Sequence, residues 1–215
     1  MIRLDILSDP ICPWCYIGKM SLDKALNGRD LNPFEIAWHP FQLNPEMPRE
    51  GMDRTAYLEA KFGGAEGAKA TYGRIEDAAK SAGLDVRFDL ITRTPNTLDA
   101  HRLIRWAGVE DRQGPVVDQL FHRYFVKGQD ISDREVLVEC ARTAGMDAEV
   151  TARLLDGDAD LEEVRAEDAR ARQMGVTGVP TFLVAGQYAL PGAQPPQTWL
   201  KVIDELTAPK EAPAH

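Results

Sequence analysis

Hydrophobic and polar residues alternate in two short segments near the N-terminus, with a helical pattern between them. Residues 2–7 alternate as a β-strand does, and residues 34–38 do so again. From residue 16 to residue 26 apolar side chains recur at helical spacing, and Asn27-Gly28 is a common helix end. A strand, a helix and a second strand in so short a stretch predict a βαβ unit with parallel strands.

The middle of the chain, from about residue 50 to residue 155, is helical in pattern and shows no convincing strand. Apolar side chains recur there every three or four positions. The predicted helices span residues 97–107, 114–126, 133–144 and 148–155, with one or two more between 55 and 79. We therefore interpret residues 50–155 as a helical insertion.

Strand pattern returns near the C-terminus. We predict a helix over 160–174, a hairpin of strands 180–184 and 187–190, and a last helix over 195–206. The element order predicts a compact α/β module that the helical insertion splits. The predicted division is 1–49 with 156–207 for the module, 50–155 for the insertion, and 208–215 for a frayed, disordered tail.

Composition narrows the classes of partner. The chain has 215 residues and a net charge of −9, so it repels polyanions and nucleic acid is not an expected partner. No apolar run is long enough to cross a membrane. The first residues pass directly into strand pattern without the apolar segment of a signal peptide. We expect a cytoplasmic protein that does not bind membranes.

Two of the three cysteines, Cys12 and Cys15, stand at the predicted start of the first helix. Pro13 suits the first helical position, because its missing N–H would be unpaired there. The unpaired N–H groups and the dipole of a helix start favour negative charge, and the thiolate is the nucleophilic form of cysteine. We therefore predict that Cys12 is exposed and attacks, whereas Cys15 lies deeper and resolves.

Other interpretations of these cysteines exist. A Cys-x-x-Cys pair can be half of a zinc site, which needs two further ligands. We expect no metal, because none of the remaining candidates is paired at ligand spacing: His39, His101, His122, His215 and Cys140. Two inert core cysteines are a second alternative, which Pro13 and the preceding loop disfavour. Cys140 is predicted to be a packed, unreactive thiol, because it lies mid-helix among apolar residues.

Two motifs and the element order resemble one known family. The motifs are Cys12-Pro13-Trp14-Cys15 at a helix start and Gly178-Val179-Pro180-Thr181-Phe182 before a strand. They resemble the DsbA-like branch of the thioredoxin superfamily, and cytoplasmic FrnE-like members are similar again within residues 8–19, 96–103 and 192–195. The resemblance runs from residue 1 to about residue 206. It implies an α/β thioredoxin fold with a large all-helical insertion, and no bound cofactor.

The resemblance also implies which residues form the site. Pro180 would follow a cis peptide bond and lie against the cysteine pair, so it joins Cys12 and Cys15 as a catalytic candidate. The backbone of Val179 would then face the substrate and pair with it like an added strand. The insertion would cover the site. The substrate-binding candidates are Pro13, Trp14, Val179, His39, Phe41, Asn96 and Gln194.

Four of these candidates have an equally good local role. His39 and Phe41 can pack the loop after the second strand. Asn96 can cap the helix that begins near Thr97, and Gln194 can be a surface residue.

Relatives that share the fold leave the reaction open. Hydroxychromene-carboxylate isomerases and kappa-class glutathione transferases are similar around the site but carry serine where this chain has Cys12. Keeping both thiols favours dithiol chemistry, so we predict a protein disulfide oxidoreductase or isomerase acting on a protein or small-molecule thiol or disulfide. The alternatives are a glutathione-dependent isomerase or transferase, with glutathione as co-substrate, and a non-enzymatic holdase or scaffold. A homodimer is compatible with each.

Overall fold

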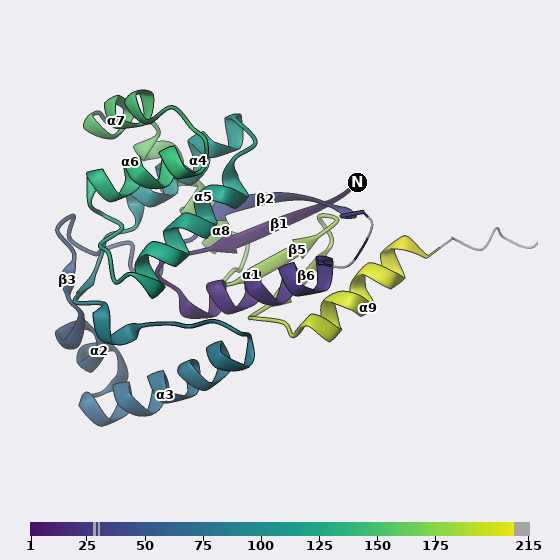
Figure 1. Cartoon of the computed structure of the whole chain (residues 1–215), viewed down its shortest axis with the longest axis horizontal. Helices are drawn as coiled ribbons and strands as arrows, with labels where there is room; N and C mark the ends of the chain where they lie inside the picture. Colours follow the sequence, from purple (N-terminus) through teal and green to yellow (C-terminus); the bar gives the residue numbers. More distant parts are fainter. Residues whose placement is uncertain (28, 30, 209–215) are drawn as a thin grey trace, which may run out of the picture.

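A four-stranded sheet lies at the centre of the computed structural model, which describes residues 1–27, 29 and 31–208. Its strands, in spatial order, are β2 (Phe34–Pro40), β1 (Ile2–Ser8), β5 (Thr181–Val184) and β6 (Tyr188–Pro191). β1 is parallel to β2 and antiparallel to β5, and β6 is antiparallel to β5. The pairing confirms the predicted parallel βαβ unit and the C-terminal hairpin (Figure 1).

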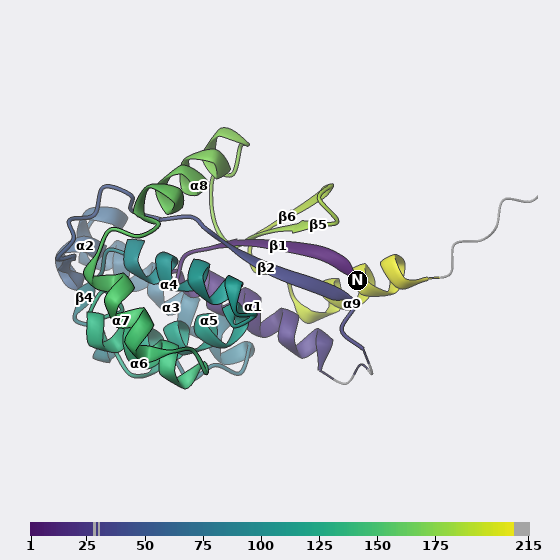
Figure 2. The ribbon, with the colours of Figure 1, turned by 90° about the horizontal axis from the view of Figure 1, so that it is seen from above.

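Helices cover both faces of the sheet. α1 (Pro13–Leu26) and α9 (Pro196–Thr207) lie on one face and α8 (Leu161–Gln173) on the other (Figure 2). The alternation along β1 explains this arrangement. Leu4 and Ile6 belong to the main core with α1 and α9, whereas Leu7 packs with Ala171 of α8. Trp199 of α9 is fully buried in the same core.

The middle of the chain forms a group of helices at one end of the sheet (Figure 1). They are α2 (Arg54–Phe62), α3 (Ala65–Ser81), α4 (Leu98–Val109), α5 (Gln113–Phe121), α6 (Arg134–Thr143) and α7 (Ala148–Asp156). A 3-10 turn at Phe88–Leu90 and a π-helical turn at His122–Val126 interrupt them. The prediction that this block has no strand is wrong: β3 (Met52–Asp53) pairs with β4 (Arg93–Thr94). Strands of two residues are too short to leave an alternating pattern.

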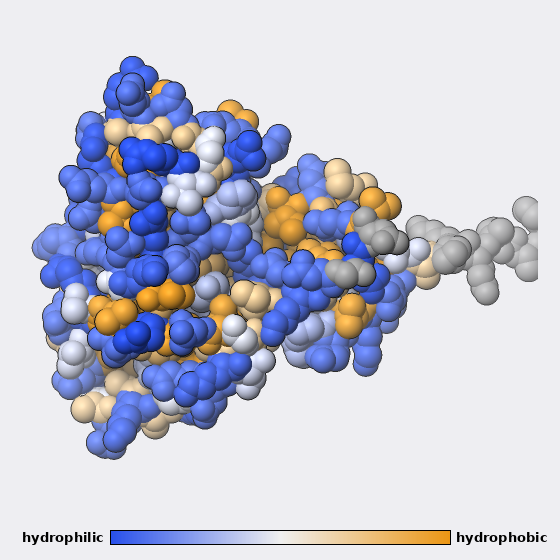
Figure 3. Space-filling model, in the orientation of Figure 1, coloured by the Kyte–Doolittle hydropathy of each residue, from blue (hydrophilic) through white to orange (hydrophobic). Residues whose placement is uncertain are grey.

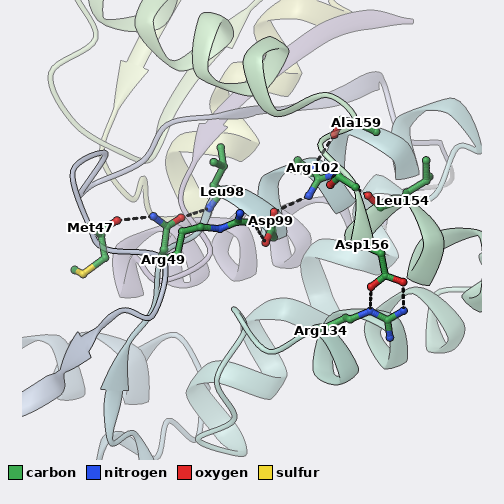
Figure 4. A network of polar contacts seen from close by, with 11 residues as sticks. Met47, Arg49, Leu98, Asp99, Arg102, Arg134, Leu154, Asp156 and Ala159 are labelled. Atoms are coloured by element: carbon green, nitrogen blue, oxygen red, sulfur yellow. Dashed lines mark hydrogen bonds and ion pairs between the residues drawn. The ribbon is translucent and has the colours of Figure 1, made fainter.

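A buried arginine ties α4 to the connection between α7 and α8. Arg102 has no solvent exposure, and its Nε donates to the carbonyl of Ala159 at 2.7 Å. Its Nη2 donates to the carbonyls of Leu154 and Gly157 at 2.7 and 2.6 Å, and its Nη1 pairs with Asp99 at 2.8 Å (Figure 4). The guanidinium thus supplies donors to carbonyl groups in the last turn of α7 and in the connection that follows it.

Apolar residues gather inside the molecule. One hydrophobic core contains Leu4 and Phe182 of the sheet together with Leu103 and Leu137 of the helical block. The face in Figure 3 is mostly hydrophilic, with apolar residues in small groups. No helix within the described residues has both the length and the apolar composition to span a membrane. Because the core continues across both parts, the predicted division at about residues 50 and 155 stays a prediction.

The predicted end of the first helix and the predicted C-terminal tail fall only partly within the described residues. α1 ends at Leu26 with Asn27 as its C-cap, as the sequence pattern predicts. Gly28, the second half of that predicted helix end, lies outside the described residues, and so do residues 209–215 of the predicted tail.

Candidate active site

Cys12 lies at the point where the first strand turns into the first helix. It is the N-cap of α1, and Pro13 is the first residue of the helix. The backbone N–H of Cys12 donates to the carbonyl of Asp9 at 2.9 Å, and its carbonyl accepts from Cys15 N at 3.0 Å. The first turn of α1 contains no acidic residue. The cysteine pair therefore begins at a helix N-terminus, as the sequence predicts.

Cys12 is buried, which corrects the expectation of an exposed thiol. It is 3% exposed and Cys15 is 1% exposed. The Cys12 thiol donates to the backbone carbonyl of Val179 at 3.6 Å, so the loop before β5 lies against the sulfur. The Val179–Pro180 peptide bond is cis, as the resemblance implies. Helix-start position alone could not predict this burial, because the covering loop is 167 residues away in the sequence.

The three thiols differ in their surroundings. Burial, and then the neighbouring Cys12, raise the pKa of Cys15 well above its usual value. The side chain of Ser8 and the backbone of Asp9 act in the opposite direction. Cys140 has no solvent exposure, and burial raises its pKa to about 12, which confirms the prediction of a packed thiol.

A cavity of about 260 Å³ lies beside Cys12. Of the predicted substrate-binding residues, Pro13, Trp14 and Val179 line it together with Cys12. The opposite wall comes from α2, α3, β4 and the π-helical turn, so the helical block covers the cysteine. Its lining residues are Arg54, Tyr57, Lys61, Phe62, Thr71, Tyr72, Ile75, Thr94 and Tyr124.

His39 and Phe41 lie away from this cavity, on the face of the sheet that α8 covers. Nε2 of His39 is 2.7 Å from Oδ1 of Asp5. Phe41 is 2% exposed, and the guanidinium of Arg172 in α8 lies 4.2 Å from its ring centroid. The strand direction places both side chains beneath α8, so the structure does not bring them to Cys12.

Asn96 and Gln194 also make local contacts and do not line the cavity. Oδ1 of Asn96 accepts from the backbone N–H of Leu98 at 2.9 Å, at the start of α4, and its Nδ2 donates to the carbonyl of Met47 at 2.6 Å. Nε2 of Gln194 donates to the carbonyl of Pro191 at 2.7 Å. Both contacts correspond to the local roles that the sequence leaves open for these residues.

A buried acid in the loop before Cys12 lies near a buried histidine of α4, and the sequence predicted neither their burial nor their proximity. Asp9 has no exposure and His101 is 3% exposed, with Nε2 of His101 3.8 Å from Oδ1 of Asp9. The Asp9 carboxyl accepts from the backbone N–H groups of Leu43 at 2.6 Å and Ile11 at 3.4 Å. Burial raises the pKa of Asp9 to about 7 and lowers the pKa of His101 to about 4.

Metal binding finds no support in the arrangement of side chains. Across residues 1–27, 29 and 31–208, no three His, Cys, Asp or Glu side chains gather at distances that would hold an ion.

Comparisons with known proteins agree with this geometry. The model of the DSBA-like thioredoxin domain family matches residues 3–204. The crystal structure of a probable DsbA oxidoreductase from Streptomyces coelicolor is 32% identical, with a TM-score of 0.84, and the match covers 99% of this chain and 94% of that one. Among curated proteins, the uncharacterized protein YwbO of Bacillus subtilis is 24% identical over 205 residues, covering 95% of this chain and 96% of YwbO.

Two more distant structures share the fold. The cytosolic disulfide reductase DsbM from Pseudomonas aeruginosa, solved with GSH, is 19% identical with a TM-score of 0.70 and covers 95% of this chain and 98% of its own. A 2-hydroxychromene-2-carboxylate isomerase is 15% identical with a TM-score of 0.72 and covers 95% of each chain. These matches confirm the predicted thioredoxin fold with a helical insertion.

Proposed function

The chain belongs to the DSBA-like thioredoxin domain family, and we propose that it exchanges thiols and disulfides through Cys12 and Cys15. One observation carries the proposal. Cys12 stands at the N-terminus of α1, faces the cavity, and lies 3.6 Å from the Val179 carbonyl. A thiol in that place has a helix dipole to stabilise its thiolate and a backbone strand end to receive a substrate.

The proposed reaction needs only the two thiols. In the reducing direction the Cys12 thiolate attacks one sulfur of a substrate disulfide, forms a mixed disulfide and releases the other sulfur as a thiolate. Cys15 loses its proton, attacks Cys12 Sγ and releases the second substrate thiolate. The two electrons of the dithiol have then passed to the substrate, and the Cys12–Cys15 disulfide remains. The oxidising direction is the reverse.

The proposal also covers the cellular compartment and the roles of the two parts of the chain. We place the dithiol chemistry in residues 1–49 and 156–207, and most of the opposing cavity wall in residues 50–155. A cytoplasmic setting is supported by the likeness to the cytosolic reductase DsbM. The substrate is a thiol or disulfide, and that reductase was solved with GSH, which supports glutathione as a co-substrate here.

Trapping the mixed disulfide tests the proposal. Cys15→Ser should accumulate a stable adduct between Cys12 and a substrate thiol, visible by mass spectrometry, because the resolving thiol is gone. Cys12→Ser should form no adduct, and Cys140→Ala should behave as wild type, because that thiol is packed in the core. Equilibration with reduced and oxidised glutathione should yield a measurable Cys12–Cys15 disulfide. Failure to detect that disulfide in wild type would refute the proposal.

The same variants separate the alternatives. A glutathione-dependent isomerase or transferase would keep its turnover in Cys15→Ser, whereas dithiol turnover would collapse. A holdase would keep full function when both cysteines are replaced by serine.

A further inference from the structure

The cavity beside Cys12 contains a buried arginine with an unused hydrogen-bond donor. Arg54 is 7% exposed and lines the cavity. Its Nη1 donates to the hydroxyl of Tyr124 at 3.4 Å, whereas its Nη2 is buried and has no partner among the described residues. The guanidinium lies 4.8 Å from the ring centroid of Tyr72. The aromatic ring offsets part of the cost of burying the charge but does not satisfy the free N–H groups.

This arginine differs from the other buried arginine of the helical block. Arg102 donates to three backbone carbonyls and pairs with Asp99. Arg54 has one long hydrogen bond to a neutral hydroxyl. Buried guanidinium groups are normally paired, because leaving one unsatisfied is destabilising. Among the described residues, Arg54 therefore has no anionic partner, although a buried guanidinium normally has one.

The rest of the cavity favours the same kind of ligand. Lys61 lies at its exposed edge and donates to the hydroxyl of Tyr57 at 2.6 Å. Thr94 is 1% exposed and also lines the cavity, and its hydroxyl has no partner among the described residues. The lining contains two basic and no acidic residues, although the chain has 34 acids and 25 bases. The cavity is thus a local site of positive potential with free donors.

We propose that this cavity selects low-molecular-weight disulfides and thiols that carry a carboxylate, with Arg54 binding the carboxylate while the sulfur meets Cys12. A guanidinium fits a carboxylate through two parallel N–H donors, and Thr94 supplies a further hydroxyl. A volume of about 260 Å³ suits a small molecule. The inference rests on the proposed function and deepens it by naming the charge and size of the substrate. The bonds formed and broken are those of the exchange between Cys12, Cys15 and the substrate sulfurs.

Three disulfides that share an S–S–CH₂–CH₂ unit test the charge preference. Fully reduced protein is mixed in a single turnover with dithiodipropionate, hydroxyethyl disulfide or cystamine, which carry negative, no and positive charge. Formation of the Cys12–Cys15 disulfide is followed by alkylation and mass spectrometry. Arg54→Met should lower the ratio of the rate constants for dithiodipropionate and hydroxyethyl disulfide by about 10- to 100-fold, the effect of one charge-assisted hydrogen-bonded pair. Arg54→Lys should lower it less, because it keeps the charge but not the paired donors.

Controls keep the test decisive. Arg74→Met, on the exposed side of α3 and away from the cavity, removes the same charge and should leave the ratio as in wild type. An unchanged ratio in Arg54→Met would overturn the inference. If Arg54→Met does not fold, two other measurements replace it: the ratio of rate constants in Lys61→Met, and the dependence of the wild-type ratio on ionic strength. An unchanged ratio in Lys61→Met, with no fall in wild type between about 20 mM and about 500 mM salt, would also overturn it. A wild-type protein that none of the three disulfides oxidises would instead refute the proposed function.

Discussion

The two walls of the cavity beside Cys12 are built from different kinds of residue. One wall, formed by residues 11–14 and 178–179, contains no charged side chain. The opposite wall, from the helical block, carries Arg54 and Lys61 among tyrosine and threonine hydroxyls. The wall from the start of α1 and the loop before β5 holds the sulfur and the backbone that, in the proposed function, meet the substrate disulfide. The helical wall offers groups that distinguish one small molecule from another, so reactivity and selection come from separate parts of the chain.

The walls also differ in how tightly they are packed. On the sheet side, a Cβ atom added to Gly18 of α1 would lie 3.1 Å from Pro180 Cγ and 3.3 Å from Phe182 Cζ. On the helical side, the same addition to Gly73 of α3 meets nothing within 4 Å. Buried Gly18 thus leaves no spare room between α1 and Pro180, whereas the exposed face of α3 at Gly73 can accept a side chain.

The largest expected effect compares the two buried arginines. Arg102→Met should lower the free energy of unfolding by about 3–5 kcal/mol, because it removes a buried donor group from three carbonyl oxygens and from Asp99. Arg54→Met should cost about 1 kcal/mol or less, since the lost hydrogen bond to Tyr124 and the lost contact with the Tyr72 ring are offset by removing a buried, unsatisfied Nη2. Urea unfolding followed by circular dichroism measures both values. Equal costs would mean that Arg54 is a structural residue like Arg102, and the contrast between the walls would fail.

The fold was largely predictable because its elements carry periodic patterns. β1, α1 and the C-terminal hairpin follow from alternation and helical spacing, and most helices of the central block from their amphipathic pattern. The pair β3 and β4 was missed because two residues give no period. The π-helical turn at His122–Val126 was absorbed into one predicted helix, since its apolar residues keep nearly the same spacing.

The site was predictable only where residues are neighbours in the sequence. Cys12, Pro13 and Cys15 form a local motif whose position at a helix start is visible in the pattern. The burial of Cys12 depends on Val179, far away in the chain, and only the resemblance pointed there. Arg54 follows an Asp53 N-cap at an ordinary helix start. Nothing local indicates that its side chain reaches the cavity, so the selective wall needed the structure.

The second prediction concerns two buried titratable residues that lie close together, one from each part of the chain. Asp9 comes from the loop after β1 and His101 from α4. Because the folded protein raises the pKa of Asp9 to about 7, its contribution to stability is present below about pH 4 and is lost as pH rises to about 7. Because the pKa of His101 falls to about 4, its contribution is present above about pH 6.5 and is lost as pH falls to about 4. Between about pH 4 and about pH 6.5 the contributions of Asp9 and His101 to the free energy of unfolding therefore change in opposite directions.

Single substitutions should therefore reveal opposite pH slopes. Relative to wild type, Asp9→Asn should gain stability as pH rises from about 4 to about 7, by up to ~1.4 kcal/mol per pH unit. Relative to wild type, His101→Gln should lose stability as pH rises from about 4 to about 6.5, with a slope of similar size. Urea unfolding at several pH values across this range measures the differences. Variants whose stability runs parallel to wild type would show that burial does not shift the pKa values of Asp9 and His101 in these directions.

The smallest expected effect tests the packing contrast with one chemical change made twice. Gly73→Ala, mid-helix with open space around it, should stabilise the protein by about 0.5–1 kcal/mol, since alanine is the better helix former. Gly18→Ala gains the same propensity but pushes α1 against Pro180, which costs about 1–3 kcal/mol. Both variants remove a glycine from the unfolded chain, so that contribution cancels in their difference. Thermal unfolding should therefore rank Gly73→Ala above wild type and Gly18→Ala below it. If both substitutions stabilise equally, α1 can move away from Pro180 without cost, and the contact between α1 and the loop before β5 does not fix the position of the thiols.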